Sequence, residues 1–269
     1  FTFECNIEDI NIELLTFLKS TKVNRLSIGL ESTKKSNLEY LGRKYSIDFR
    51  NKIELACKYF DNVNVDLIYA LKTETLKDLE DDLDFLISMN IKHISTYSLI
   101  IEEHTKFRFE KNIDDEIDYE MYKLINKKLA NYHHYEVSNF SLDGYESKHN
   151  LVYWNNNKYY GFGLGASGFI DDIRYENNRN ILEYINGKFL KDYEKIDELK
   201  DMQNEMILGL RKLDGVSKKN FYLKYGKKIE DVFDIKELLN SKKLIDNGKN
   251  IYISYDYIYL SNEILINFI

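Results

Sequence analysis

One short segment combines residue types that suit a large planar ligand carrying a metal. An imidazole, an amide and two aromatic side chains lie within six positions, at His149, Asn150, Tyr153 and Trp154. Aromatic rings stack on flat surfaces, and an imidazole nitrogen can coordinate a metal ion. The same residue types also suit the edge of a core that a tryptophan and a tyrosine close, with His149 held by hydrogen bonds. Residue types alone leave both interpretations open.

Charged residues near the ends of predicted strands form a second candidate site. Asp66 interrupts an apolar strand, where an unpaired carboxylate is costly. Glu4 and Glu31 end two other strands, and Arg43 follows in a loop. If the strands are parallel, these groups meet at one rim and suit a ligand with an amine, a carboxylate and ribose hydroxyls. S-adenosylmethionine is one such metabolite among many, and an internal salt bridge from Asp66 to Arg25 or Arg43 is the alternative.

Alternating strands and helices position these charges. Period-two alternation or continuous apolar runs predict strands at 1–5, 24–30, 63–71 and 93–99. Apolar residues at helical spacing predict helices between them. Such alternation implies parallel strands joined by crossover helices. Because no Gly-x-Gly-x-x-Gly follows the first strand, the pattern favours part of a (β/α) barrel over a dinucleotide-binding fold.

The sequence predicts three regions. Residues 1–170 form the partial barrel and an extension, 171–200 form a polar connecting segment with a helix near 181–185, and 201–269 form a small separate domain. The predicted fold class is therefore α/β, with a partial barrel of parallel strands followed by an α+β domain.

The last region predicts three helices, the third over 232–244, and a hairpin of 251–253 with 257–260. Three helices and a hairpin are typical of a winged-helix-like domain. Domains of that kind often bind DNA, but this one has no basic excess, which favours packing or protein contact.

Composition limits the function classes. The chain has 269 residues, 43% of them hydrophobic, a net charge of −7 and a pI of about 5.4. The acidic balance argues against nucleic acid as a partner. No apolar run reaches the roughly 18 residues of a membrane-spanning helix, although peripheral membrane association stays compatible. Cys5 and Cys57 are too few for a disulfide framework, which predicts a cytoplasmic location, and both are expected in the core.

The aromatic segment resembles a motif of a known family. His149-Asn150-Leu151-Val152-Tyr153-Trp154 is similar to the HNxxYW motif of HemW-type haem chaperones, which are radical-SAM proteins related to the oxygen-independent coproporphyrinogen III oxidases. Segments throughout nearly the whole chain resemble the same family, among them Phe3-Glu4-Cys5-Asn6, Asn24-Arg25-Leu26-Ser27-Ile28-Gly29-Leu30-Glu31-Ser32, Leu41-Gly42-Arg43 and Val65-Asp66-Leu67-Ile68-Tyr69.

The resemblance implies two ligand sites. It implies that S-adenosylmethionine contacts Glu4, Glu31, Arg43 and Asp66. It also implies a haem site made of His149, Asn150, Tyr153 and Trp154. In that site His149 is the axial ligand or a contact of the haem iron, the two aromatic rings stack near the macrocycle, and Asn150 orients a propionate or the histidine.

The sequence departs from the family pattern at three places. Glu31 stands where the family has Gln, which adds a negative charge. The loop Leu71-Lys72-Thr73-Glu74-Thr75 replaces Leu-Pro-Gly-Gln-Thr, and Gly165-Ala166-Ser167-Gly168 replaces Gly-Ala-His-Ser.

The family's iron–sulfur motif is a further departure. Radical-SAM proteins hold a 4Fe–4S cluster with a CxxxCxxC loop, whose thiolates bind three irons and leave the fourth for S-adenosylmethionine. Cys5 and Cys57 do not have this spacing. Since Phe1 lies in what resembles the family's third barrel strand, the cluster ligands are expected upstream, and the chain as given is expected to be inactive in radical chemistry.

Three functions follow from the resemblance. The first is a haem chaperone whose partners are haem or a porphyrin and a haem-receiving protein. The second is an oxygen-independent coproporphyrinogen III oxidase, which decarboxylates propionates oxidatively in porphyrin biosynthesis. The third is a diverged paralogue that acts only as a binding module. The intact aromatic motif favours the first.

Overall fold

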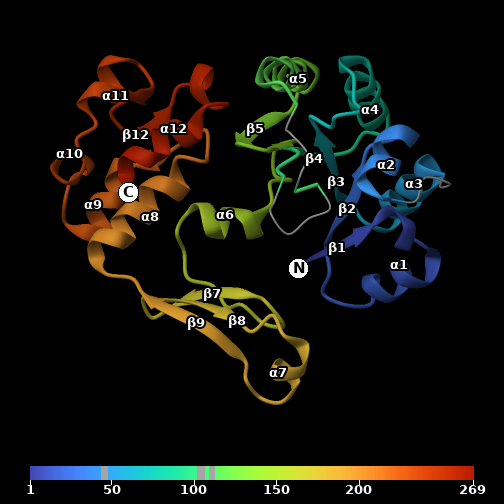
Figure 1. Ribbon diagram of the computed structural model, residues 1–269, viewed down its shortest axis with the longest axis horizontal. Helices are drawn as coiled ribbons and strands as arrows, with labels where there is room; N and C mark the ends of the chain where they lie inside the picture. Colours follow the sequence, from blue (N-terminus) through green and yellow to red (C-terminus); the bar gives the residue numbers. More distant parts are fainter. Residues whose placement is uncertain (44–47, 102–106, 109–112) are drawn as a thin grey trace. The chain divides into compact units, whose positions relative to one another are not determined.

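Two units make up the fold, Phe1–Glu146 and Ser147–Ile269. The computed structural model describes residues 1–43, 48–101, 107–108 and 113–269 (Figure 1). The division between the units falls inside the predicted region 1–170, and the boundaries predicted at residues 170 and 200 stay predictions.

A six-stranded sheet forms the centre of the first unit. Its strands are β1 (Thr2–Asn6), β2 (Arg25–Glu31), β3 (Asn62–Tyr69), β4 (His93–Ser98), β5 (His133–Glu136) and β6 (Asn139–Ser141). The order is β1-β2-β3-β4-β6-β5, and the first four strands are parallel, which confirms the predicted α/β class. Strand β6 runs antiparallel to β4 and forms a tight hairpin with β5.

Helices connect the parallel strands. They are α1 (Ile12–Lys19), α2 (Lys35–Leu41), α3 (Phe49–Tyr59), α4 (Leu76–Ser88) and α5 (Asp115–Lys128), with a 3₁₀ turn at Ile7–Asp9. Polar side chains satisfy backbone N–H groups at several helix starts, as Thr75 does for α4 in a capping box with Asp78.

The two faces of this sheet differ in polarity. In β3, Val63, Val65 and Leu67 belong to the hydrophobic core that the sheet shares with α1, α3, α4 and α5 (Figure 1). Successive strand residues point to opposite faces, so Asn64 and Asp66 lie on the other face. That second face is polar and carries the first candidate site.

The second unit begins with α6 (Lys148–Trp154) and an antiparallel sheet. The strands are β7 (Ser167–Ile170), β8 (Ile173–Asn177) and β9 (Leu190–Lys195), in the order β7-β8-β9, with α7 (Ile181–Ile185) between β8 and β9. The predicted helix near 181–185 is present. Strands β8 and β9 went unpredicted because they are charged, and all six residues of β9 are exposed, so no apolar alternation marks them.

The C-terminal part of this unit packs helices against a second small sheet. Its helices are α8 (Glu198–Gly209), α9 (Lys218–Tyr225), α10 (Ile229–Val232), α11 (Lys236–Asn240) and α12 (Ser261–Leu265). Its strands are β10 (Val216–Ser217), β11 (Leu244–Asp246) and β12 (Asn250–Ile253), in the order β10-β12-β11, and 3₁₀ turns lie at Tyr255–Tyr257 and Ile266–Phe268.

The predicted hairpin of 251–253 with 257–260 is wrong. β12 pairs with β11 and β10, while Tyr255–Tyr257 forms a 3₁₀ turn that leads toward α12. Ile258 is fully buried in this turn, which explains an apolar alternation that looked like a strand. The helix predicted over 232–244 is also shorter in the structure. Helix α11 covers only Lys236–Asn240, and Leu244 belongs to β11.

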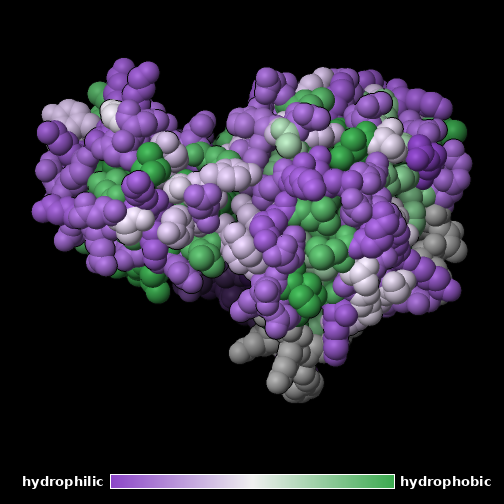
Figure 2. Space-filling model, turned by 90° about the horizontal axis from the view of Figure 1, so that it is seen from above, coloured by the Kyte–Doolittle hydropathy of each residue, from purple (hydrophilic) through white to green (hydrophobic). Residues whose placement is uncertain are grey.

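Hydrophilic side chains predominate on the face seen in Figure 2, consistent with the acidic composition. Among the described residues, no helix is both long and apolar enough to span a lipid bilayer. The expectation that Cys57 lies in the core is wrong, because its side chain is exposed. Helix α3 turns Ile53 and Ala56 into the core, and Cys57 lies beside them on its exposed side.

Candidate functional site

The polar face of the first sheet brings together Glu4, Glu31, Arg43 and Asp66. In the parallel register Glu4 is opposite Ser27, and Gly29 is opposite Asp66. A Cβ atom on Gly29 would lie 3.5 Å from Glu31 Oε1 and 3.8 Å from Asn6 Oδ1, so both side chains lie over this glycine. The absence of a side chain at Gly29 therefore leaves room for this polar group.

Glu31 and Arg43 form a two-point ion pair. Arg43 Nε donates to Glu31 Oε2 at 2.7 Å, Nη2 donates to Oε1, and Nη1 donates to Asn6 Oδ1 at 2.9 Å. The Glu31 side chain is 9% exposed and that of Arg43 is 39% exposed. Fork-like pairing of this kind fixes both groups more strongly than a single contact does.

The ends of β2 and β3 carry unusual backbone angles. Glu31 has a φ of 69° and Ala70 has a φ of 62°. Residues other than glycine rarely adopt this left-handed region, and such strain concentrates at ligand sites. The strained positions lie at the carboxyl ends of adjacent parallel strands, where barrel folds place their sites.

Asp66 is held by hydrogen bonds rather than by an ion pair. Asn64 Nδ2 donates to Asp66 Oδ1 at 2.8 Å, and Ser27 Oγ donates to Oδ2 at 3.3 Å. The carboxylate is half-buried. The alternative of an internal salt bridge to Arg25 or Arg43 is wrong, since Arg43 pairs with Glu31 and Arg25 has no ion pair among the described residues.

The loop after β2 is anchored by a carboxylate that the sequence did not reveal. Asp82 of α4 is 1% exposed and accepts hydrogen bonds from Ser32 Oγ at 2.6 Å, from Thr33 N at 3.0 Å and from Thr33 Oγ1. Burial raises the pKa of Asp82. These bonds tie α4 to the residues that directly follow Glu31. The position of Asp82 among the buried apolar residues of α4 is the sequence feature that could have indicated this contact.

Helix α6 presents the aromatic motif. Ser147 caps the helix, and its Oγ accepts from Asn150 N at 3.5 Å. His149 and Tyr153 lie one turn apart, with the hydroxyl of Tyr153 2.8 Å from His149 Nε2 and the two rings edge-on. Tyr159 in turn packs edge-on against Tyr153, at 4.5 Å between ring centroids. His149 is exposed, so its ring is open to a ligand.

Asn150 and Trp154 occupy the neighbouring stripe of the same helix, since i and i+4 residues align. The guanidinium of Arg211, just beyond α8, lies 5.5 Å from the Trp154 ring. Trp154 Nε1 is buried and has no hydrogen-bond partner among the described residues. The four motif residues therefore lie on two adjacent stripes of α6, with His149 and Tyr153 directly linked.

The glycine-rich loop after α6 is fixed by backbone contacts. Gly161 N–H donates to the hydroxyl of Tyr175 at 2.9 Å, and Asn177 Nδ2 donates to Gly161 O at 3.2 Å. The side chains of Tyr160 and Phe162 stack with ring centroids 5.7 Å apart and are 66% and 83% exposed. This loop also holds Tyr159 beside Tyr153.

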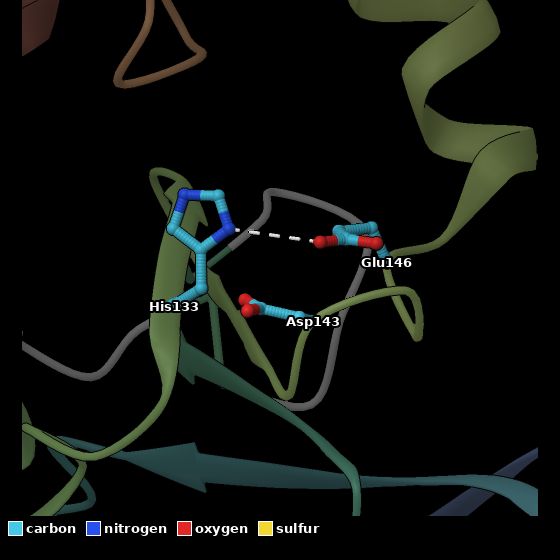
Figure 3. Close-up of side chains that lie close together, drawn as sticks. All are labelled: His133, Asp143 and Glu146. Atoms are coloured by element: carbon cyan, nitrogen blue, oxygen red, sulfur yellow. Dashed lines mark ion pairs between the residues drawn. The ribbon is translucent and has the colours of Figure 1, made fainter.

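A third group, His133, Asp143 and Glu146, lies beside the β5–β6 hairpin (Figure 3). His133 Nδ1 is 3.6 Å from Glu146, and the ligand atoms of all three lie within 4.8 Å of one another. His133 and Asp143 are exposed, and the spacing is that of a surface ion pair.

The two cysteines do not fit as iron ligands. Burial raises the pKa of the Cys5 thiol to about 11, with Asp9 and Asp66 adding to the shift. Cys57 is exposed, and the two residues lie on different elements, β1 and α3. Iron binds the thiolate, which the environment of Cys5 disfavours.

Profiles of two protein families match the chain. That of the Radical SAM superfamily matches residues 1–86, and that of the HemN C-terminal domain matches residues 196–261.

Curated relatives align over nearly the whole chain. The heme chaperone HemW of Lactococcus lactis subsp. lactis is 34% identical over 284 residues, covering 100% of this chain and 75% of the relative. The heme chaperone HemW of Bacillus subtilis is 37% identical over 281 residues, covering 98% of this chain and 74% of the relative.

A solved structure has the same fold. The radical-SAM coproporphyrinogen III oxidase HemN of Escherichia coli superposes with a TM-score of 0.83, covering 99% of this chain and 69% of that one. At 15% sequence identity this likeness concerns the fold alone.

Proposed function

Because the chain belongs to the HemW family of radical-SAM proteins, we propose that it is a haem chaperone, which binds haem and S-adenosylmethionine and delivers haem to a receiving protein. The resemblance read from the motifs is confirmed by relatives that are 34% and 37% identical and are named heme chaperones. The fold alone would equally suit the oxidase, so the choice between them depends on these relatives and on the aromatic motif.

Helix α6 carries the proposal for haem. His149 is exposed, and its Nε2 lies 2.8 Å from the hydroxyl of Tyr153. If Nε2–H donates to Tyr153, the lone pair of Nδ1 remains for the haem iron, and a hydrogen bond on the opposite nitrogen is what orients most metal-binding histidines. Tyr153 and Trp154 offer flat apolar faces for the macrocycle. The side-chain amide of Asn150 supplies a donor for its propionates.

The polar face of the first sheet carries the proposal for S-adenosylmethionine. That ligand would bring an ammonium, a carboxylate, a sulfonium and ribose hydroxyls. Glu4 and Asp66 offer acceptors for the ammonium and hydroxyls, and Arg43 would offer its donor fork to the carboxylate in exchange for its pairing with Glu31. The strained ends of β2 and β3 support a ligand site at this edge.

An iron–sulfur cluster supplies electrons for radical chemistry in this superfamily. Cys5 and Cys57 do not fit it, so we assign no step of this chain's function to the cluster. We further propose that the protein works in the cytoplasm and without a nucleic-acid partner, the second of which its net charge of −7 supports.

Replacing His149 by alanine is expected to weaken haem binding by about tenfold or more, because the iron loses its protein ligand. Titration with haemin followed in the Soret band measures this. His133→Ala is the matched control, since His133 is also exposed but lies in the other unit. Its titration is expected to equal that of the wild type.

Two results would contradict the proposal. Equal haemin affinity in wild type and His149→Ala would remove His149 from the haem site. Anaerobic conversion of coproporphyrinogen III by the protein would instead favour the oxidase. If the protein neither binds haemin nor converts coproporphyrinogen III, the diverged binding module is the function that remains.

Glu31→Gln is expected to strengthen S-adenosylmethionine binding by about threefold to tenfold. Glu31 occupies the guanidinium fork of Arg43 in the structure, and an amide would release that fork to the ligand carboxylate. Equilibrium dialysis with labelled S-adenosylmethionine measures the change. Weaker binding in the variant would mean that the Glu31 carboxylate itself meets the ligand's ammonium.

A further inference from the structure

His93 is fully enclosed on the polar face of the first sheet. Its side chain is 0% exposed, and both ring nitrogens have partners. Nδ1 lies 2.5 Å from Asn64 Oδ1, and Nε2 lies 2.7 Å from the hydroxyl of Tyr135. Asn64 is 1% exposed, so the imidazole–amide contact is closed to solvent.

The direction of these hydrogen bonds follows from Asn64. Its Nδ2 donates to Asp66 Oδ1 at 2.8 Å and to Ser27 Oγ at 2.7 Å. The opposite amide orientation would place the carbonyl oxygen against the Asp66 carboxylate, which is repulsive. Asn64 Oδ1 therefore faces His93, and because an amide oxygen only accepts, His93 Nδ1 must carry the proton.

The charge state of His93 follows from its surroundings. Burial, together with the positive charge of Arg25, lowers the pKa of His93 to about 3. Arg25 is 8% exposed; burial lowers its pKa, and the nearby carboxylates of Asp66 and Glu4 favour its charged form. A neutral ring with its proton on Nδ1 leaves Nε2 to accept from the Tyr135 hydroxyl.

The chain of hydrogen bonds ends on a carboxylate that a ligand can reach. It runs from Tyr135 through His93 and Asn64 to Asp66, and Ser95 Oγ adds a second donor to Asn64 Oδ1 at 3.0 Å. Of the residues in this chain of hydrogen bonds, only Asp66, on β3, is partly exposed. The buried side chains thus hold the Asn64 amide in place, and that amide holds the Asp66 carboxylate.

We propose that His93 is a positioning residue of the S-adenosylmethionine site, which acts by fixing the Asn64 amide so that Asp66 presents its carboxylate to the ligand. The inference rests on the proposed function, because it takes Asp66 as a ligand contact. Without the Nδ1 donor, the Asn64 amide can turn, and Asp66 loses its 2.8 Å hydrogen bond.

Two substitutions at His93 separate its two nitrogens. The side-chain nitrogen of asparagine superposes on Nδ1, so His93→Asn keeps the donor to Asn64 and loses the contact with Tyr135. Glutamine reaches the position of Nε2, so His93→Gln keeps a partner for Tyr135 and loses the donor to Asn64. Both variants shrink or reshape the same buried site, so they control for general loss of packing.

Binding of S-adenosylmethionine by equilibrium dialysis is the test. His93→Gln is expected to weaken it about tenfold and His93→Asn by less than about threefold, with haemin titrations of both unchanged. Nitrogen NMR of labelled histidine is expected to show the Nδ1–H form for His93. Equal losses in both variants, or lower melting temperatures with unchanged ligand affinity, would show a purely structural role and overturn the proposal.

Asp66→Asn distinguishes this inference from the proposed function beneath it. If Asp66→Asn weakens S-adenosylmethionine binding and His93→Gln does not, the positioning role is wrong while the site stands. If the wild type does not bind the ligand, or Asp66→Asn binds it equally well, the assignment of the site itself fails and the positioning role fails with it.

Discussion

Alanine at position 161 is expected to lower the free energy of unfolding of the second unit by about 3 kcal/mol. A Cβ atom on Gly161 would overlap the backbone carbonyl of Ser167 in β7, so the loop after α6 must move away from the sheet. The contacts of Gly161 with Tyr175 and Asn177 would then be lost. Because backbone cannot yield as a flexible side chain can, the cost is large. Thermal unfolding followed by circular dichroism measures it.

Gly163→Ala is the matched control for this prediction. Gly163 has a φ of 98°, and a Cβ atom there meets nothing within 4 Å. Alanine at this position meets backbone strain alone, with an expected loss of about 1 kcal/mol. Gly161→Ala is also expected to weaken haemin binding, since Tyr159 leaves the ring of Tyr153. Equal stabilities of the two variants would show that the loop does not depend on its approach to β7.

Glu74→Gln is expected to raise the free energy of unfolding of the first unit, relative to the wild type, by about 3 kcal/mol more at pH 8 than at pH 5. Glu74 is 7% exposed, and its Oε1 is buried without a hydrogen-bond partner among the described residues. Burial raises the pKa of Glu74 from 4.5 to about 8. Glutamine is also the residue of the family motif that this loop resembles.

The sign follows from proton binding. The folded protein holds the Glu74 proton more tightly than the unfolded chain does, so the stabilising contribution is complete below pH 4.5 and is lost as the pH rises through about 8. Glutamine does not titrate, so its advantage grows over the same interval.

Urea unfolding of wild type and variant from pH 5 to 8 gives this difference directly. His93 and His134 act in the opposite direction, because burial lowers their pKa values to about 3 and about 4, and they cancel when the two proteins are compared at each pH. Glu39→Gln, at an exposed position, is the control and is expected to show no such trend. A Glu74→Gln difference that stays constant with pH would rule out a buried, protonated Glu74.

The parallel strands were predictable because burial leaves a periodic trace in sequence. In β3, apolar Val63, Val65 and Leu67 alternate with polar residues, and the structure buries the apolar set. The C-terminal hairpin was mispredicted because the alternation around Ile258 is equally compatible with a tight turn that buries one side chain. β9 was missed because a strand with no buried residue carries no hydrophobic signal.

The candidate site was predictable only in part. Carboxylates at strand ends indicated that Glu4, Glu31 and Asp66 share a face, and the register places them there. Which groups bond to them could not be predicted. The pairing of Glu31 with Arg43, and the support of Asp66 by Asn64, depend on strand register and loop path, which local pattern does not specify.

The two edge strands of the β7-β8-β9 sheet, β7 and β9, are protected from pairing with another chain in different ways. Beyond β7, Tyr159 bridges to Phe169 and occupies the outward backbone N–H and C=O of that residue. β9 lies at the other side of the sheet, and its residues Lys191, Asp192, Glu194 and Lys195 are charged and exposed. Another chain that added a strand there would have to strip water from these charges, so β9 is guarded against self-association by electrostatics where β7 is guarded by contact.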